Sequence, residues 1–374
     1  MNRIPIAAPD LSGREEQYVV EAIRSSWISS NGSFLSRFET EFAEVCGTES
    51  TIAVCNGTVA IHLALLGLGL QPGDEVIVPS LTFIATANAV RYVGANPIFV
   101  DVDPKTWCLD PRLIAERVTS RTKGIVAVHL YGHPADMDAI QEIADAYRLW
   151  VVEDAAEAPW GKYKGRKVGG LADLGTFSFY GNKIITSGEG GAVSVKDKKL
   201  ETQLRMLRGQ GMDPQRRYFF PIIGHNFRMT NICAALLCAQ LERATKMLEK
   251  RRRIFSQYKE ELRKIPGIEF QPVAEWAELS PWLFCCLVNE KEFGRNSEEV
   301  MDELARRGIE TRPFFIPIHT LPPYRCDGAV LSLPVTEDLA RRGVSLPTHS
   351  QLSEAQISQI TTCIAEIQKS SSKS

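Results

Sequence analysis

The 374-residue chain has no excess of charge of either sign. It carries 43 lysine and arginine residues against 45 aspartate and glutamate residues, which gives a formal net charge of −2. Proteins that bind nucleic acid or anionic membranes through charge usually have a basic surplus. The composition therefore argues against nucleic acid or a membrane surface as the main partner.

Long hydrophobic runs are also missing. The longest apolar stretch, 52–70, is interrupted by Asn56, His62 and several glycines. It predicts a buried strand, turn and helix rather than a membrane span. Residues 1–5 have no apolar core of the kind found in signal peptides. We therefore expect a cytoplasmic protein.

Two motifs that would suggest other functions are absent. The nine cysteines include no C-x-x-C pair and no matching histidine cluster, which argues against a zinc site and predicts reduced thiols in the core. A dinucleotide-binding oxidoreductase would have a G-x-G-x-x-G turn after an early strand, but the turn at 55–58 contains only Gly57. The sequence predicts no metal site.

The first half of the chain alternates strand patterns with helix patterns. This alternation predicts an α/β fold with a mostly parallel sheet and helices on both faces. The expected strands are 51–55, 75–78, 97–100, 124–128 and 149–153, and the expected helices are 58–68, 84–93, 111–118 and 136–147.

The pattern changes after residue 175. Strands at 176–180 and 192–195 are separated by a glycine-rich loop too short for a full helix, so they should be neighbours in the same sheet. A long helix at 231–262 would link a large domain, 1–245, to a small α+β domain, 246–374. In the small domain we expect a strand at 284–288, a helix at 297–307 and a proline-rich segment at 312–324.

Asn56, Gly57 and Thr58 join the first strand to a helix N-terminus. Such a junction offers free backbone N–H groups and the positive end of the helix dipole, which suit a phosphate. The same three residues could equally form a plain turn and helix cap.

The predicted strand 149–153 ends in a run of carboxylates that includes Asp154 and Glu157. Ligands of parallel sheets gather at the carboxyl ends of the strands. A carboxylate there is well placed to pair with a cationic ring nitrogen. Alternatively, Asp154 could cap the next helix.

Lys183 follows an apolar strand and a turn at Gly181. A lysine in this position can lose its water, which lowers its pKa and leaves a neutral amine able to attack an aldehyde. A lysine in a loop can also be ordinary solvated surface, so Lys183 alone does not decide the function.

The three features together predict pyridoxal 5′-phosphate (PLP) as the cofactor. PLP requires a phosphate cradle, a carboxylate for its ring nitrogen and a lysine for its aldehyde. The turn at 56–58, Asp154 and Lys183 supply these groups in that order, with Ser178 as a second phosphate ligand.

The segments 175–183, 188–191, 153–157 and 56–58 together resemble the DegT/StrS family of nucleotide-sugar aminotransferases, which have PLP fold type I. The resemblance spans nearly the whole chain. It implies a large domain with a mostly parallel sheet flanked by helices and a smaller α+β C-terminal domain. A related branch carries histidine at the lysine position and works as a dehydratase, so Lys183 favours transamination.

The resemblance also implies roles for individual residues. Lys183 would carry the cofactor and act as the general base. The cofactor-binding residues would be Gly57, Thr58, Phe83, Asp154, Glu157, Ser178, Lys183 and Asn226. Asn226 would reach the cofactor of the neighbouring subunit, so the site would lie at the interface of a homodimer. The substrate-binding residues would be Ser29, Ser30, Arg228 and His319, with Arg228 on a carboxylate of the amino donor.

Five segments, 27–30, 129–134, 207–212, 226–231 and 319–324, resemble a branch of the family that acts on a GDP-linked sugar. The implied reaction moves an amino group from L-glutamate to the C4 ketone of GDP-4-keto-6-deoxy-D-mannose, giving a sugar of lipopolysaccharide O-antigens. An enzyme for a UDP- or dTDP-linked keto sugar, acting at C4 or C3, is an open alternative. A non-catalytic PLP-fold regulator or binding protein is a distant one.

Overall fold

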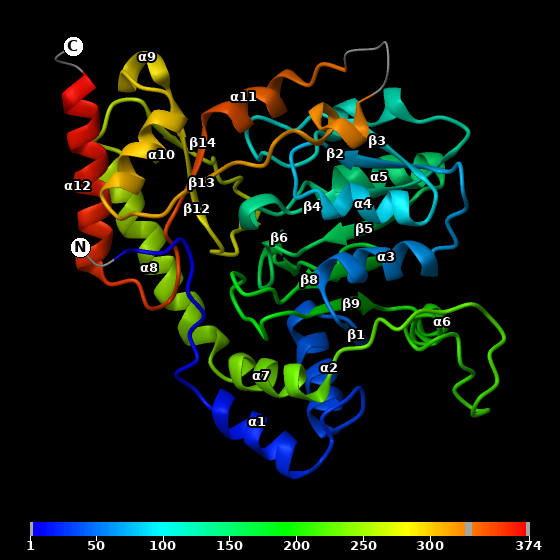
Figure 1. Ribbon diagram of the computed structural model, residues 1–374. Helices are drawn as coiled ribbons and strands as arrows, with labels where there is room; N and C mark the ends of the chain where they lie inside the picture. Colours follow the sequence, from blue (N-terminus) through cyan, green and yellow to red (C-terminus); the bar gives the residue numbers. More distant parts are fainter. Residues whose placement is uncertain (1–2, 326–330, 372–374) are drawn as a thin grey trace.

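The computed structural model describes residues 3–325 and 331–371, and its centre is a seven-stranded sheet (Figure 1). The strand order is β1-β9-β8-β5-β4-β2-β3. Only β9 runs antiparallel to its neighbours, which confirms the mostly parallel sheet and the pairing of the two strands after residue 175. The strands are β1 (Ser50–Val54), β2 (Glu75–Pro79), β3 (Asn96–Val100), β4 (Thr122–Val128), β5 (Trp150–Asp154), β8 (Leu174–Ser178) and β9 (Gly191–Val195).

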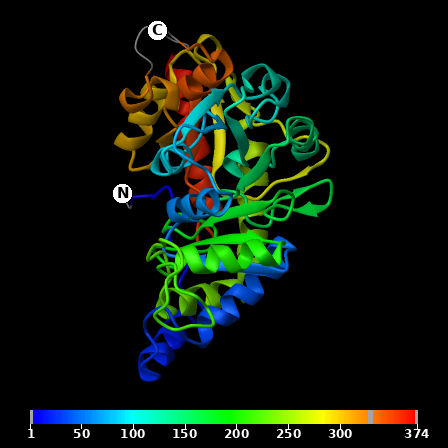
Figure 2. The ribbon, with the colours of Figure 1, turned by 90° about the vertical axis from the view of Figure 1, so that its right-hand side faces the viewer.

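The central strands are apolar because both faces of the sheet are covered. On β5, for example, Val151 and Val152 point to opposite faces and are both fully buried, each in a different core cluster. Three helices pack on one face: α3 (Gly57–Gly67), α4 (Ala85–Tyr92) and α6 (Lys198–Arg208). The other face is covered by α2 (Ser33–Cys46), α5 (Met137–Tyr147) and α7 (Asn231–Leu241), with α1 (Glu15–Arg24) packed on α7 (Figures 1 and 2).

The C-terminal part forms a second, antiparallel sheet with the order β10-β12-β14-β13. Helices α8 and α12 lie beside it (Figure 1). The strands are β10 (Ile268–Phe270), β12 (Phe284–Val288), β13 (Arg312–Pro313) and β14 (Gly343–Leu346), and the helices are α8 (Ala244–Leu262), α9 (Glu290–Phe293), α10 (Ser297–Arg306), α11 (Pro334–Arg342) and α12 (Glu354–Ser371). A small third sheet contains β6 (Lys162–Tyr163), β7 (Arg166–Lys167) and β11 (Ala277–Glu278).

The N-terminal segment lies against this C-terminal part, because Ile4 pairs with Ile309 through a parallel bridge. The division of the chain at residue 245/246 stays a prediction. Among residues 3–325 and 331–371, no helix combines the length and apolarity needed to cross a membrane. The cysteines that the structure describes are free thiols, and most of them are buried.

Two expected helices are wrong in detail. The segment 111–118 forms two short 3₁₀ turns, Pro111–Leu113 and Ala115–Arg117, rather than an α-helix. The backbone becomes extended at Val118. The segment therefore forms only the i→i+3 hydrogen bonds of a 3₁₀ turn and not the i→i+4 bonds of an α-helix. The helix expected at 231–262 is broken into α7 and α8 at Arg243, whose side chain is held by Asp10 and Glu15 of the N-terminal segment.

A buried hydrogen-bonding group lies near the carboxyl end of β5. Glu153 and His129 are fully buried, with the Glu153 carboxylate 3.0 Å from His129 Nε2. The same carboxylate accepts backbone N–H groups from Gly169, Leu171 and Ala172. Glu153 therefore fixes the loop that leads into β8.

Replacing Glu153 with alanine should destabilise the protein strongly, because four donors would lose their acceptor in the core. We expect the free energy of unfolding, measured by urea denaturation, to fall by about 3–5 kcal/mol. The matched control is Glu278→Ala, which removes an exposed pair with Lys162 and should cost at most about 1 kcal/mol. Equal effects of the two substitutions would contradict this account of Glu153.

Candidate active site

A cavity of about 490 Å³ opens at the carboxyl ends of β4, β5 and β8. In parallel sheets this edge is where ligands bind. The structure brings seven of the residues expected at the cofactor to its wall: Gly57, Thr58, Phe83, Asp154, Glu157, Ser178 and Lys183.

The turn between β1 and α3 forms one side of the cavity. The Asn56 side chain caps α3 by accepting the N–H of Val59 at 2.9 Å. Gly57 lies so close to the end of β8 that a Cβ atom on it would stand 2.7 Å from the Cβ of Ser178. The first N–H groups of a helix have no partner within the helix, so this end of α3 presents donors and a positive dipole beside two hydroxyl groups. Such a cradle suits a phosphate.

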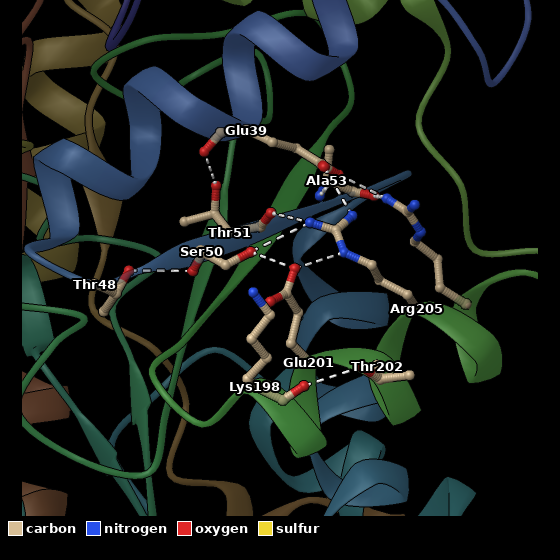
Figure 3. A network of polar contacts seen from close by, with 10 residues as sticks. Glu39, Thr48, Ser50, Thr51, Ala53, Lys198, Glu201, Thr202 and Arg205 are labelled. Carbon is tan, nitrogen blue, oxygen red and sulfur yellow. Dashed lines mark hydrogen bonds and ion pairs between the residues drawn. The ribbon is translucent and has the colours of Figure 1, made fainter. Parts of the chain in front are cut away.

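A partly buried polar network holds β1 in place behind this turn (Figure 3). On α2, the carboxylate of Glu39 accepts from Arg205, from Arg208 and from the N–H of Ala53, at 2.8, 2.8 and 2.9 Å. Arg208 also donates to the Ala53 carbonyl at 2.9 Å. Two elements on opposite faces of the sheet, α2 and α6, therefore fix the strand that leads into the turn at Gly57.

The carboxyl end of β5 places two acids at the floor of the cavity. Asp154 is buried, and its Oδ2 accepts the hydroxyl of Thr86 at 2.7 Å. The N–H of Ala156 reaches Oδ1 at 3.3 Å, so Asp154 closes a turn here and does not cap a helix. Burial raises the pKa of Asp154, and the Thr86 hydrogen bond partly opposes that rise.

Glu157 accepts the backbone N–H of Tyr131 at 2.7 Å. Burial also raises the pKa of Glu157, while the nearby Lys183 opposes the rise. Two buried acids with few donors beside a lysine form a site whose charges respond strongly to a bound ligand.

Lys183 lies in the loop between β8 and β9. Its N–H donates to the Tyr180 carbonyl at 2.9 Å, which holds the turn that presents the side chain. The amine lies 3.8 Å from the ring centroid of Trp282. Burial lowers the pKa of Lys183, and the carboxylates of Glu157 and Asp154 oppose that fall. Burial therefore makes the amine of Lys183 more reactive than the amine of an exposed lysine.

The structure does not bring the other expected residues to this cavity. Ser30 and Arg228 line a separate cavity of about 200 Å³. Asn226 is exposed and accepts from Arg228 Nε at 3.1 Å. The Ser29 carbonyl accepts the N–H of Asn231 at 2.6 Å. The roles of these four residues stay predictions.

His319 is buried away from the cavity wall. Its Nδ1 lies 2.7 Å from Ser80 Oγ, and its Nε2 lies 3.3 Å from a carboxylate oxygen of Glu337. The Ile318 N–H donates to the Ser80 carbonyl at 3.0 Å, so this segment supports the loop that carries Phe83. The predicted contact of His319 with substrate stays untested.

Several cavity residues were not expected from the sequence. They come from distant parts of the chain and include Thr86, Tyr131, Trp282, Arg312 and Phe315. None belongs to a motif with a fixed spacing to Lys183. A sequence signal exists only for Tyr131, which falls within the segment 129–134.

Comparison with known proteins identifies the family. Residues 9–365 match the DegT/DnrJ/EryC1/StrS aminotransferase family, and the chain belongs to it. The chain is 47% identical over 366 residues to GDP-perosamine synthase of Caulobacter vibrioides, with 98% of each chain covered.

Solved structures agree in fold. DesI, determined in the presence of its TDP-sugar product, has a TM-score of 0.93 and 31% identity, covering 100% of this chain and 95% of that one. Spr1654 from Streptococcus pneumoniae, solved in its PLP form, has a TM-score of 0.91 and 27% identity, with 99% of each chain covered. The protein is therefore an aminotransferase with the fold expected from its sequence.

The phosphate cradle can be tested by filling it. Gly57→Ala would push a methyl group against Ser178, so we expect the affinity of the apo protein for PLP to fall at least about tenfold, equivalent to about 1.4 kcal/mol. Affinity for pyridoxal, which lacks the phosphate, should change much less. Both are measured by absorbance titration.

The control is Gly69→Ala, just beyond the other end of α3, where the backbone φ is +76° and no atom of the described residues lies within 4 Å of the added Cβ. It should strain the backbone without changing PLP affinity. Equal losses for PLP and pyridoxal in Gly57→Ala would contradict the assignment of this turn to the phosphate.

Proposed function

We propose that the protein transfers the amino group of L-glutamate to the C4 ketone of GDP-4-keto-6-deoxy-D-mannose, with PLP as cofactor, and so makes GDP-perosamine. The observation that carries the chemistry is the convergence of Lys183, Asp154 and the cradle at Gly57 in one cavity. The substrate assignment is supported by the 47% identity, over nearly the full length, to a GDP-perosamine synthase.

The residues present fit this cofactor. Gly57, Thr58 and Ser178 form an anion cradle that a side chain at position 57 would fill. Asp154 is buried, with a single side-chain donor from Thr86. It can therefore pair with a cationic ring nitrogen. When bound, the cofactor would supply an electron sink for the carbanion formed at the amino carbon.

The chain's own groups would move the proton and hold the cofactor. Lys183 Nζ would take the α-proton of glutamate and later return a proton to C4 of the sugar. Asp154 would keep a positive charge on the ring nitrogen, and Glu157 would lie near the ring hydroxyl. Phe83 lies in the cavity wall, with its ring centroid 6.0 Å from that of Phe315. From there it would cover the ring of the cofactor.

Lys183→Ala should remove the proton-transferring amine. We expect turnover to fall by at least about 10²–10⁴-fold, the usual contribution of a general acid–base group. The assay follows the amino sugar by mass spectrometry with glutamate as donor. Near-normal turnover in this variant would contradict the proposed mechanism.

The same assay decides the substrate when it compares GDP-4-keto-6-deoxymannose with UDP- and dTDP-linked 4-keto sugars. We expect the GDP-linked sugar to have the highest kcat/KM. A preference for a dTDP-linked sugar would favour the alternative that the likeness to DesI suggests. No amino product from any keto sugar would favour a non-catalytic role.

We also propose a homodimer in which Asn226 acts on the cofactor of the partner subunit. Asn226 is exposed and lies outside its own chain's cavity, which leaves its side chain available to another subunit. The neighbouring segment carries exposed apolar side chains, among them Tyr218, Phe220 and Ile223. These features support an interface at this segment.

Mixed dimers provide a sharp test. Lys183→Ala and Asn226→Ala should each lower activity when pure. If Asn226 acts across the interface, a mixed dimer has one site with both substitutions and one intact site, so unfolding and refolding the two variants together should restore activity. No restoration, although mixed dimers are present, would show that Asn226 does not act in the partner's site.

A further inference from the structure

Trp282 is the aromatic residue that contacts the reacting amine. It precedes β12, far along the chain from Lys183, and its side chain is buried with only 3% exposed. The amine of Lys183 lies 3.8 Å from the centre of its ring. This distance is well within the range in which a lysine ammonium is attracted to an indole face.

Trp282 is held through both its indole ring and its backbone. Its Nε1–H donates at 2.9 Å to the carbonyl of Asn182, the residue just before Lys183. The backbone carbonyl of Trp282 accepts from Arg251 of α8 at 2.8 Å. Arg251 is itself buried and also donates to the carbonyls of Pro281 and Thr348. The loop that carries Lys183 and helix α8 therefore both hold Trp282 in position beside the lysine.

The other groups near the amine have different tasks in the proposed function. Asp154 and Glu157 both interact electrostatically with Lys183, yet both would be engaged by the cofactor once it is bound. The indole ring has no group that titrates, so it can attract an ammonium without taking its proton. The remaining titratable groups of the cavity wall are Tyr131, Tyr180, Glu189 and Arg312.

We propose that Trp282 is a catalytic-site residue. Its ring binds the amine of Lys183 and holds it in position whenever this amine is not bound to the cofactor. The ring face stabilises the ammonium form, and the bond to Asn182 keeps the amine in place for the next proton transfer. This inference rests on the proposed function, because only a lysine that leaves the cofactor in each cycle needs a group that holds its free amine in position.

The test is the pH dependence of PLP capture by the apo protein, followed by visible absorbance. Only the neutral amine attacks an aldehyde, so the capture rate rises through the pKa of Lys183. Trp282→Leu removes the ring face that favours the ammonium. The midpoint of the profile should therefore move to lower pH, by about 0.5–1 unit.

Two further variants complete the design. Trp282→Phe keeps an aromatic face but loses the bond to Asn182, and it should shift the midpoint in the same direction by less. Trp107→Leu is the control, because Trp107 is equally buried and packs on Phe314, outside the cavity wall. It should lower the melting temperature and leave the midpoint unchanged.

Each outcome decides the proposal. A midpoint that rises in Trp282→Leu would show that the ring only excludes water from the amine. An unchanged midpoint would show that the ring does not bind the ammonium. Both results overturn the inference. If the leucine variant does not fold, a phenylalanine variant with a midpoint at or above the wild-type value overturns it as well. Wild-type protein that captures no PLP would instead overturn the proposed function.

Discussion

The site depends on the burial of a lysine amine beside two carboxyl groups. Removing charged groups from water is costly, and the cost is tolerated only where opposite charges and hydrogen bonds compensate. Here Lys183 interacts electrostatically with Glu157 and Asp154, and its amine also contacts the ring of Trp282. As a result, water solvates the charged form of this amine poorly, and its charge depends strongly on the neighbouring groups.

The fold brings these groups together from distant parts of the chain. Asp154 ends β5 and Glu157 follows it, Lys183 follows β8, and β5 pairs with β8 in parallel, so both strands end at the same edge. The antiparallel β9 pairs with both β8 and β1. It therefore links the strand before Lys183 to the strand before the turn at Gly57. The buried Glu153 and the partly buried Glu39, which lie behind two of the strand ends, hold this edge in place.

The sequence predicted the parts of this site that follow one strand or one turn. The carboxylates after β5, the turn at Gly57 and Lys183 each lie at a fixed step from an apolar strand, so the strand pattern located them. Trp282 could not be found in this way, because it reaches Lys183 only through the packing of the C-terminal part against the large sheet.

Long-range contacts explain one error in secondary structure, and the shortness of the segment explains the other. The pattern at 231–262 is helical throughout, but Arg243 is held by Asp10 and Glu15 from the other end of the chain, and the helix breaks there. At 111–118 the helical pattern is too short to overcome the extended chain at Val118. In both places long-range contacts or short length outweighed local propensity.

The central claim, that Lys183 binds PLP covalently, has a direct measurement. Purified protein is reduced with borohydride, digested, and mapped by mass spectrometry for the peptide that carries the reduced cofactor. If Lys183 carries the cofactor, the yellow colour is lost and the label is found on Lys183. A label on another lysine, or protein that takes up no PLP at all, would contradict it.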